Sequence, residues 1–237
     1  MNFSLKHKSY TKAAKIQDKV SAWAAGWLPK IPQLPGVPVE LGAGTGLFTH
    51  HLANKFPDLL ATDLSQNMLE EGRRNCPKAK WEVLNAWELP ENRNYGSLFS
   101  SSLMQWCENP SETFQQWFRC LAPGGWMLHS FFVEGTLQEL KELEPECIAV
   151  NFRPAEEWKT CLESAGFRHV VIETREDFQS YPNALGFFRN LHDIGATSPG
   201  KIPPARLRQI IESYDRAYGR NGRVPATWVT ARILCKR

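Results

Sequence analysis

A glycine-rich turn behind a short apolar run most constrains how this 237-residue chain can fold. Residues 39–49 read VELGAGTGLFT, so an apolar run ending in an acid leads into Gly42, Gly44 and Gly46. The spacing is G-x-G-x-G, whereas the dinucleotide fingerprint G-x-G-x-x-G would need a glycine where Leu47 stands. No Lys-Ser or Lys-Thr pair follows the glycines, which excludes a phosphate-binding P-loop. The stretch therefore predicts a strand, a tight turn and a helix, with the main chain open to close approach by a ligand.

Apolar and amphipathic segments alternate along the chain after this turn. We predict strands at 37–41, 58–63, 80–84, 97–102, 125–132, 168–177 and 225–237. Helices are expected at 46–56, 65–75, 111–120, 135–144 and 154–165. Such alternation indicates an α/β fold in which helices cover both faces of a mostly parallel sheet. Ligands of such sheets bind beyond the carboxyl ends of the strands.

Two helical segments flank this core. In the first, Ile16, Val20, Trp23 and Trp27 recur at helical spacing ahead of a proline-rich connector. The second is too long for a simple connection, and we interpret it as a helical lid inserted over the ligand crevice. The chain thus divides into an N-terminal helix with its connector (1–35), a core (36–180), the lid (181–224) and a final core strand (225–237).

Cysteine spacing and charge exclude several classes of protein. The six cysteines include no C-x-x-C pair, which fits neither a zinc ribbon nor a disulfide framework and predicts a reducing, cytoplasmic compartment. No apolar run reaches the roughly 20 residues that would cross a bilayer.

Residues 1–30 carry six Lys or Arg against one acid and residues 195–237 carry nine against two, whereas the middle of the chain is acidic. The basic ends are either solvated faces or a surface for an anionic partner.

Polar residues stand where the first three predicted strands end. Glu40 precedes the glycine turn, and Asp63 ends the second strand, 17 residues beyond Gly46. Asn85 and Ala86 follow the third strand. An acid in the position of Asp63 can bind both ribose hydroxyls, Asn85 and the Ala86 amide can contact adenine, and Glu40 can face a positive charge. Each residue alone has a structural interpretation, such as Asp63 capping the next helix, but together they predict S-adenosylmethionine as the ligand.

Several motifs resemble a known family. VELGAGTG, ATDLSQNML, LNAWELP and LAPGG resemble, in order and spacing, the class I S-adenosylmethionine-dependent methyltransferases over residues 36–132. SLMQWCENP, FFVEGTLQELKEL and LGFFRNLHDIGATSP are similar to the malonyl-[acyl-carrier protein] O-methyltransferases of biotin synthesis, the BioC family. The N-terminal pattern of Phe3, Tyr10, Ala14 and Gln17 fits that family too. The resemblance implies a Rossmann-like α/β fold with a mostly parallel seven-stranded sheet, flanking helices, an N-terminal helix and a helical lid.

The resemblance also implies which residues bind S-adenosylmethionine. They are Gln17, Glu40, Gly42, Gly44, Asp63, Leu64, Met68, Asn85, Ala86, Leu103, Gln105 and Trp106. Gln105 and Trp106 follow the fourth strand, where the sulfonium is expected, and an aromatic face attracts positive charge. Gln17 is expected to reach the methionine part from the N-terminal helix.

The acceptor site is expected to need an anchor for a carboxylate. Tyr10 and Arg189 lie in stretches that resemble the family, and bidentate geometry favours arginine. The family commonly has Asp where Asn85 stands and Lys in the position of His192. No metal site is expected.

The activity that the resemblance implies is methyl transfer from S-adenosylmethionine to the free carboxylate of a malonyl thioester, on acyl carrier protein or coenzyme A. A carboxylate is already ionised at neutral pH, so the reaction needs no general base. Carrier proteins are acidic, and Lys201, Arg206, Arg208 and Arg216 are candidate docking charges. We expect a monomer that binds neither nucleic acid nor membrane.

Three alternatives stay open at this point. A methyltransferase of the same fold could act on a free dicarboxylic acid. A nucleic-acid methyltransferase could use the basic ends as a phosphate track, although SLMQWC stands where base-amino methyltransferases have an N/D-P-P-Y/F tetrad. A non-catalytic module could keep the fold and the cofactor while regulating a partner.

Overall fold

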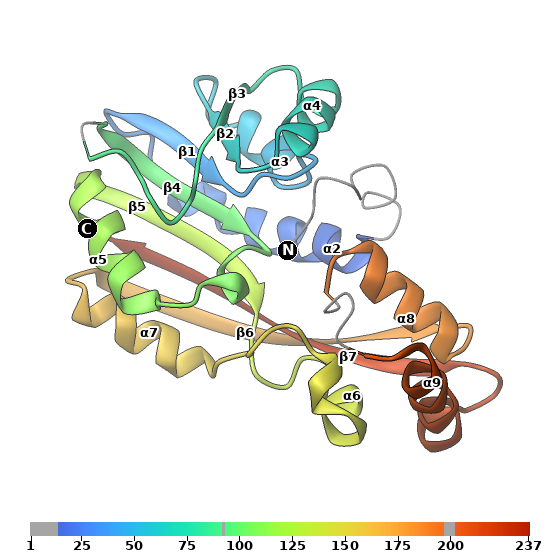
Figure 1. Cartoon of the computed structure of the whole chain (residues 1–237). Coiled ribbons are helices and arrows are strands. Elements are labelled where there is room, and N and C mark those ends of the chain that lie inside the picture. The colour runs from blue at the N-terminus through green and yellow to red at the C-terminus, as the bar shows by residue number, and fades with distance from the viewer. Residues whose placement is uncertain (1–13, 92, 197–201) are drawn as a thin grey trace.

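The computed structural model describes residues 14–91, 93–196 and 202–237, which form an α/β fold around one seven-stranded sheet (Figure 1). The strands are β1 (Val37–Leu41), β2 (Leu60–Asp63), β3 (Lys80–Val83), β4 (Tyr95–Ser101), β5 (Leu121–Phe132), β6 (Arg168–Tyr181) and β7 (Val224–Lys236). Their order across the sheet is β3-β2-β1-β4-β5-β7-β6. The first five strands are parallel, and β7 is antiparallel to both of its neighbours. The predicted fold class and mostly parallel seven-stranded sheet are confirmed.

Helices cover both faces of the sheet. They are α2 (Lys15–Ala25), α3 (Thr49–Ala53), α4 (Gln66–Asn75), α5 (Pro110–Cys120), α6 (Gln138–Leu143), α7 (Ala155–Ser164), α8 (Ala184–Asp193) and α9 (Pro204–Tyr218). Leu98 and Met127 pack with α5 and α7, whereas their neighbours Phe99 and Leu128 pack with α2 and α3 on the other face. Consecutive strand residues point to opposite faces, so the central strands β4 and β5 are largely buried on both faces. Within the described ranges, no helix combines the length and apolarity that a bilayer-crossing segment needs.

Two predicted elements are limited by residues with a left-handed backbone. The helix predicted at 46–56 is shorter and covers only α3, and it begins after residue 46 because Gly46 has a φ of +93° and still belongs to the glycine turn. The strand predicted at 97–102 begins at Tyr95 and stops at Ser101, because Ser102 has a φ of +56°. A serine with such a φ is uncommon, since its Cβ crowds the neighbouring carbonyl.

The segment predicted as a lid forms α8 and α9, which lie together near one end of β6 and β7 (Figure 1). The pairing of β7 with β5 covers Thr230 to Lys236, so residues 224–229 pair with β6 alone and extend past the core. Phe187, Tyr214 and Trp228 belong to one buried cluster that joins α8, α9 and β7. The two helices are therefore held by apolar packing on a ribbon that leaves the main sheet.

Helix α2 is held against the sheet by an arginine of β7. The Arg232 guanidinium lies over the rings of Trp23 and Trp27, 4.4 and 4.1 Å from their centroids. Its Nη1 donates to the Trp23 carbonyl at 2.7 Å, and its Nη2 pairs with Glu173 of β6. Because Gln17 is on the buried side of α2, these contacts also fix where the Gln17 side chain lies.

Candidate active site

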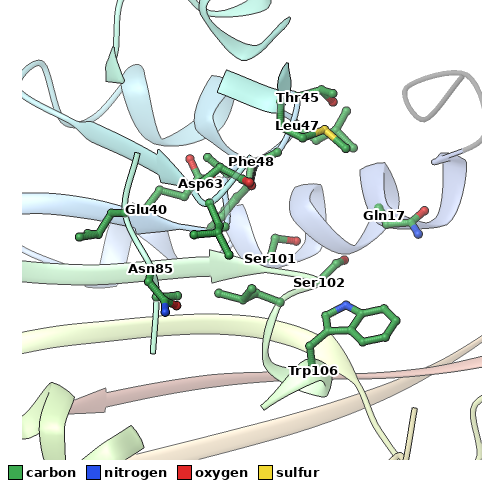
Figure 2. A pocket seen from close by; sticks show the side chains of 18 of the residues that line it. Gln17, Glu40, Thr45, Leu47, Phe48, Asp63, Asn85, Ser101, Ser102 and Trp106 are labelled. Carbon is green, nitrogen blue, oxygen red and sulfur yellow. Dashed lines mark hydrogen bonds between the residues drawn. The ribbon is translucent and has the colours of Figure 1, made fainter. Parts of the chain in front are cut away.

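A cavity of about 380 Å³, which we call the large cavity, lies at the carboxyl ends of the central parallel strands (Figure 2). Its volume is that of a small-molecule site. It is lined by eleven of the residues predicted to bind the cofactor: Gln17, Glu40, Gly42, Gly44, Asp63, Leu64, Met68, Asn85, Ala86, Leu103 and Trp106. The structure brings these residues together, and their individual contacts with a ligand stay a prediction.

Asp63 ties the end of β2 to the glycine turn. Its Oδ2 accepts a hydrogen bond from the Gly44 amide at 2.9 Å, and its Oδ1 accepts one from the Ser65 amide at 2.8 Å. The residue that caps α4 is Ser65, whose Oγ accepts from the Met68 amide at 3.4 Å, so Asp63 does not cap this helix. Since Asp63 lines the large cavity, the remaining lone pairs of its carboxylate can receive hydroxyl groups of a ligand.

Glu40 is a second carboxyl group at the large cavity, and it is almost entirely buried. The residue is 1% exposed, and the Thr49 hydroxyl donates to its Oε2 at 2.6 Å. Burial raises the pKa of Glu40 to about 8, an effect opposed by the Thr49 hydrogen bond and strengthened by the charge of Asp63. Glu40 is therefore protonated in the ligand-free protein at neutral pH and can ionise when a cation approaches.

We expect the stability of the ligand-free protein to fall as the pH rises, with Glu40 as the main cause. The pKa of Glu40 rises from an ordinary value of 4.5 to about 8 in the fold, so the folded protein holds this proton more tightly than the unfolded chain. The resulting stabilisation is complete below pH 4.5 and is lost as the pH rises through about 8. Asp63, whose pKa is also raised by burial, acts in the same direction. Urea unfolding of the wild type and of Glu40→Gln across this range measures the effect, and equal pH dependence in both proteins would contradict it.

The loop after β3 forms the end of the large cavity that lies away from α2 (Figure 2). Asn85 Oδ1 accepts from the Trp87 amide at 3.1 Å, and the Ala86 carbonyl accepts from Trp117 Nε1 at 2.8 Å. The N–H of Ala86, which lines the large cavity, is a main-chain group that can donate to a ring nitrogen. Leu64 lines the same cavity although it is 68% exposed, which suits contact with the flat face of an adenine ring.

Buried polar atoms gather at the opposite end, beside α2. Among the described residues, Gln17 Oε1, Ser102 Oγ and Gln105 Oε1 are buried and have no hydrogen-bond partner. Such atoms destabilise a folded protein unless a ligand or water completes their hydrogen bonds. Gln17 and Ser102 line the large cavity, and Figure 2 shows them on the side of Trp106, away from Asn85.

Gln105 lies outside the large cavity, in contrast to the prediction. It belongs to the 3₁₀ turn η3 (Met104–Trp106), and its Nε2 donates to the Ser102 carbonyl at 2.7 Å. This bond directs the side chain into a neighbouring space of about 50 Å³, which we call the small cavity. Gln17, Ser102 and Trp106 line both cavities.

The charge of the large cavity selects the kind of ligand it can hold. Glu40, Asp63 and Glu108 line it, and none of its described lining residues is Lys, Arg or His. Asp63 and Glu108 would repel a diphosphate and attract a cation, and Glu40 can add a further negative charge by ionising when a cation approaches. A Cβ at Gly44 would meet no protein atom within 4 Å, so the glycine turn leaves open space for a ligand beside Asp63. S-adenosylmethionine has a sulfonium and an ammonium group and no phosphate, and the residues present therefore fit it.

Nine further residues line the large cavity without having been predicted. They are Ala43, Thr45, Leu47, Phe48, Leu84, Trp87, Ser101, Ser102 and Glu108. Most are sequence neighbours of predicted residues, so their position at strand ends was a usable signal. Glu108 had no such signal, whereas Ser102 ends the strand predicted at 97–102 and precedes the predicted residue Leu103.

Of the two predicted acceptor anchors, the structure describes only Arg189. Tyr10 lies outside the described residues, and Arg189 is exposed and is not among the residues that line either cavity. The buried face of α8 includes Phe187, Phe188 and Leu191. Their helical spacing was a signal that Arg189 lies on the outer face. Its role as an anchor stays a prediction.

Sequence comparison finds relatives that span most of the chain. The family model described as "Methyltransferase domain" matches residues 39–129, which include the glycine turn, Asp63 and the loop after β3. The malonyl-[acyl-carrier protein] O-methyltransferase of Hahella chejuensis is 32% identical over 207 residues, covering 80% of this chain and 73% of the relative. The protein of the same name from Methylococcus capsulatus is 28% identical over 232 residues, covering 93% of this chain and 84% of that one.

Solved structures share the fold. The YcgJ protein of Bacillus subtilis superposes with a TM-score of 0.67 at 13% identity, covering 91% of this chain and 98% of the other. At that identity the match shows the fold alone. The sequence matches and the methyltransferase domain make S-adenosylmethionine the methyl donor and the protein an enzyme. The chain belongs to the class I S-adenosylmethionine-dependent methyltransferases, the family that includes its Hahella and Methylococcus relatives.

Proposed function

We propose that this enzyme methylates the free carboxylate of a malonyl thioester, carried by acyl carrier protein or coenzyme A, in early biotin synthesis. The observation that supports this most is the similarity to the H. chejuensis malonyl-[acyl-carrier protein] O-methyltransferase. That similarity covers 80% of the chain and extends well beyond the methyltransferase domain at residues 39–129. It therefore includes segments outside the donor site, where an acceptor would be recognised.

The chemistry requires alignment and not proton transfer. When bound, S-adenosylmethionine supplies a methyl group on a positive sulfur, which keeps the electron pair of the C–S bond as the acceptor oxygen forms the new C–O bond. The acceptor carboxylate is ionised at neutral pH, so no residue has to remove a proton. The chain has to bind the donor beside Asp63 and the glycine turn, align the reacting atoms and exclude water.

Mass spectrometry of the acceptor tests the proposal. Incubation of malonyl-acyl carrier protein with the purified enzyme and S-adenosylmethionine should add the mass of one methylene group. Malonyl-coenzyme A and free dicarboxylic acids serve as parallel acceptors, and an Asp63→Ala variant serves as the control without donor binding. Methylation of a free acid alone would replace this proposal with a free-dicarboxylate methyltransferase.

Arg189→Ala tests the proposed carboxylate anchor. A role as the anchor predicts that the KM for the malonyl acceptor rises by about tenfold or more, whereas the exposed position of Arg189, outside both cavities, predicts an unchanged KM. The Kd for S-adenosylmethionine should stay unchanged, because Arg189 does not line the large cavity. Arg189→Lys keeps the charge without the bidentate geometry, so its KM for the malonyl acceptor should lie between those of the wild type and Arg189→Ala. An unchanged KM in both variants would remove Arg189 from acceptor binding.

The described part of the lid offers exposed arginines for an acidic carrier protein. Arg208 and Arg216 of α9 are exposed. Arg206 forms an ion pair with Glu144, so it is less available for docking than predicted. Lys201 lies outside the described residues. Arg208 and Arg216 are therefore the docking charges that we propose.

Reversing both charges, as Arg208→Glu with Arg216→Glu, should lower kcat/KM for malonyl-acyl carrier protein several-fold at low salt. The loss should shrink at high salt, because rim charges act mainly on association and are screened. Arg119→Glu on α5 is the surface control, because α5 lies at the other end of the molecule from α9 (Figure 1), although Arg119 also pairs with Glu91. If the double variant behaves like Arg119→Glu, the carrier protein docks elsewhere.

A further inference from the structure

The small cavity offers a place for the acceptor next to the donor. It shares Gln17, Ser102 and Trp106 with the large cavity, so the two spaces meet at these residues. Its other walls are mostly apolar side chains, among them Phe152 after α6 and Trp228 of β7. The small cavity therefore lies where the core meets the elements that carry the lid.

The small cavity is neutral, in contrast to the large one. None of its described lining residues is charged. Methyl transfer from a sulfonium to a carboxylate cancels one positive and one negative charge. Surroundings of low polarity favour a step in which charges cancel, because separated charges are less well solvated there. The carboxyl groups of the large cavity suit a cationic donor, and the uncharged walls of the small cavity suit an acceptor that becomes neutral in the reaction.

Ser102 lies where the two cavities meet, in a strained conformation that its hydrogen bonds hold. Its φ is +56°, its amide donates to the Ser130 carbonyl at 2.7 Å, and its carbonyl accepts from Gln105 Nε2 at 2.7 Å. Its hydroxyl is buried and finds no partner within the described ranges. Nearby, Gln17 and Gln105 are 6% and 9% exposed, and each has a buried amide oxygen that likewise finds no partner there. Strain combined with unused buried polar atoms is typical of a ligand-binding position.

We infer that the small cavity is the acceptor subsite and that the Ser102 hydroxyl donates a hydrogen bond to the carboxylate that receives the methyl group. This inference rests on the proposed function. Because Ser102 lines both cavities, the bond holds the carboxylate at the entrance to the large cavity, where the donor binds. Ser102 thereby aligns the nucleophile without removing a proton.

The volume of the small cavity sets the size of the acceptor. A water-sized group needs about 10–15 Å³ of such space, so a cavity of about 50 Å³ holds about three to five of them. A carboxylate with one methylene group fits, whereas a carboxylate with the three methylene groups of a glutaryl chain exceeds this space. We therefore expect the small cavity to favour a malonyl over a glutaryl group.

Two substitutions at Ser102 separate the hydroxyl from the backbone. Ser102→Ala removes the hydroxyl, and Ser102→Gly removes it in a residue that adopts a positive φ freely. Both should lower kcat/KM for the malonyl thioester by about 10- to 100-fold, the effect of one hydrogen bond to a charged group, with the Kd for S-adenosylmethionine within about twofold. Asn221→Gly is the matched control, because Asn221 has a φ of +50° in the turn before β7. It should change neither value.

The outcomes distinguish the inference from the proposed function. Wild-type kinetics in Ser102→Gly would overturn the inference, because the Ser102 hydroxyl would then contribute nothing to acceptor binding. A weaker Kd for S-adenosylmethionine with an unchanged acceptor KM would also overturn it, by assigning the hydroxyl to the donor. If the wild type methylates a free dicarboxylic acid and no malonyl thioester, the proposed function fails. The same variants, assayed with that acid, then decide the role of Ser102.

Enlarging the small cavity tests the acceptor subsite independently. Phe152→Ala and the milder Val150→Ala both remove wall atoms. Either should raise kcat/KM for a glutaryl thioester relative to the malonyl thioester by about tenfold or more, since each methylene contributes that much to selectivity. Thermal unfolding identifies the variant that remains folded. An unchanged preference for malonyl in a folded variant would overturn the assignment of the small cavity.

Discussion

Asp63→Ala should weaken S-adenosylmethionine binding by about 100-fold or more. The carboxylate of Asp63 lines the large cavity and is the group expected to receive the ribose hydroxyls. Each hydrogen bond to a charged group contributes about 1.5–3 kcal/mol, so the loss of two gives an effect of this size. The substitution also leaves the amides of Gly44 and Ser65 without their acceptor, which loosens the turn that carries the binding site. Isothermal titration calorimetry measures the change in Kd.

Asp58→Ala is the matched control for Asp63. Asp58 lies just before the same strand, β2, but its side chain is 83% exposed in a surface ion pair with Lys80. Such pairs contribute little to stability, so this variant should bind S-adenosylmethionine as the wild type does. Equal Kd values for the two alanine variants would show that Asp63 does not contact the donor.

Gly44→Ala should severely weaken donor binding while the protein remains folded. Gly44 has a φ of +56°, and a Cβ at this position would meet no protein atom within 4 Å. The added methyl group would therefore project into open space at the glycine turn and would collide with the ligand, not with the protein. Left-handed strain in alanine costs roughly 1–2 kcal/mol of stability, which a domain of this size tolerates. We expect the Kd for S-adenosylmethionine to rise by about 10- to 100-fold, the usual penalty of an overpacked contact.

Gly222→Ala separates backbone strain from obstruction of the site. Gly222 has a φ of +69°, and an added Cβ would, as at Gly44, meet no protein atom within 4 Å, but Gly222 lies in the turn before β7. Both variants should lose a similar amount of thermal stability, because both place alanine in the left-handed region. Only Gly44→Ala should lose donor affinity. Equal binding by both would show that the glycine turn does not approach the ligand closely.

Residue type, spacing and the family resemblance together predicted eleven of the residues that line the large cavity. Glycines at 42 and 44, an acid at each of two strand ends and the loop of Asn85 and Ala86 could all be identified in the sequence. They meet in space because the carboxyl ends of parallel strands share one edge of the sheet. Once the alternation of strands and helices was recognised, the topology brought these residues into the large cavity without further information.

The direction of side chains in short turns could not be predicted from the sequence. Gln105 and Trp106 are adjacent, and both were expected at the donor, yet only Trp106 reaches the large cavity. The φ of +56° at Ser102 and the bond from Gln105 to its carbonyl turn Gln105 into the small cavity. No propensity rule predicts a left-handed serine, because such a conformation persists only where surrounding contacts hold it.

The sequence by itself determined the fold class, the donor and many of the residues that line the large cavity, because strand periodicity and strand-end chemistry are local properties. The tertiary structure alone decided where the lid side chains lie. Phe187 and Leu191 pack in the buried cluster that joins α8, α9 and β7, which leaves Arg189 on the outer face of α8, away from both cavities. It also decided that a neutral small cavity adjoins the acidic large one, because its walls come from segments as distant as Gln17 and Trp228. Contacts between such distant segments depend on packing, which local sequence patterns do not encode.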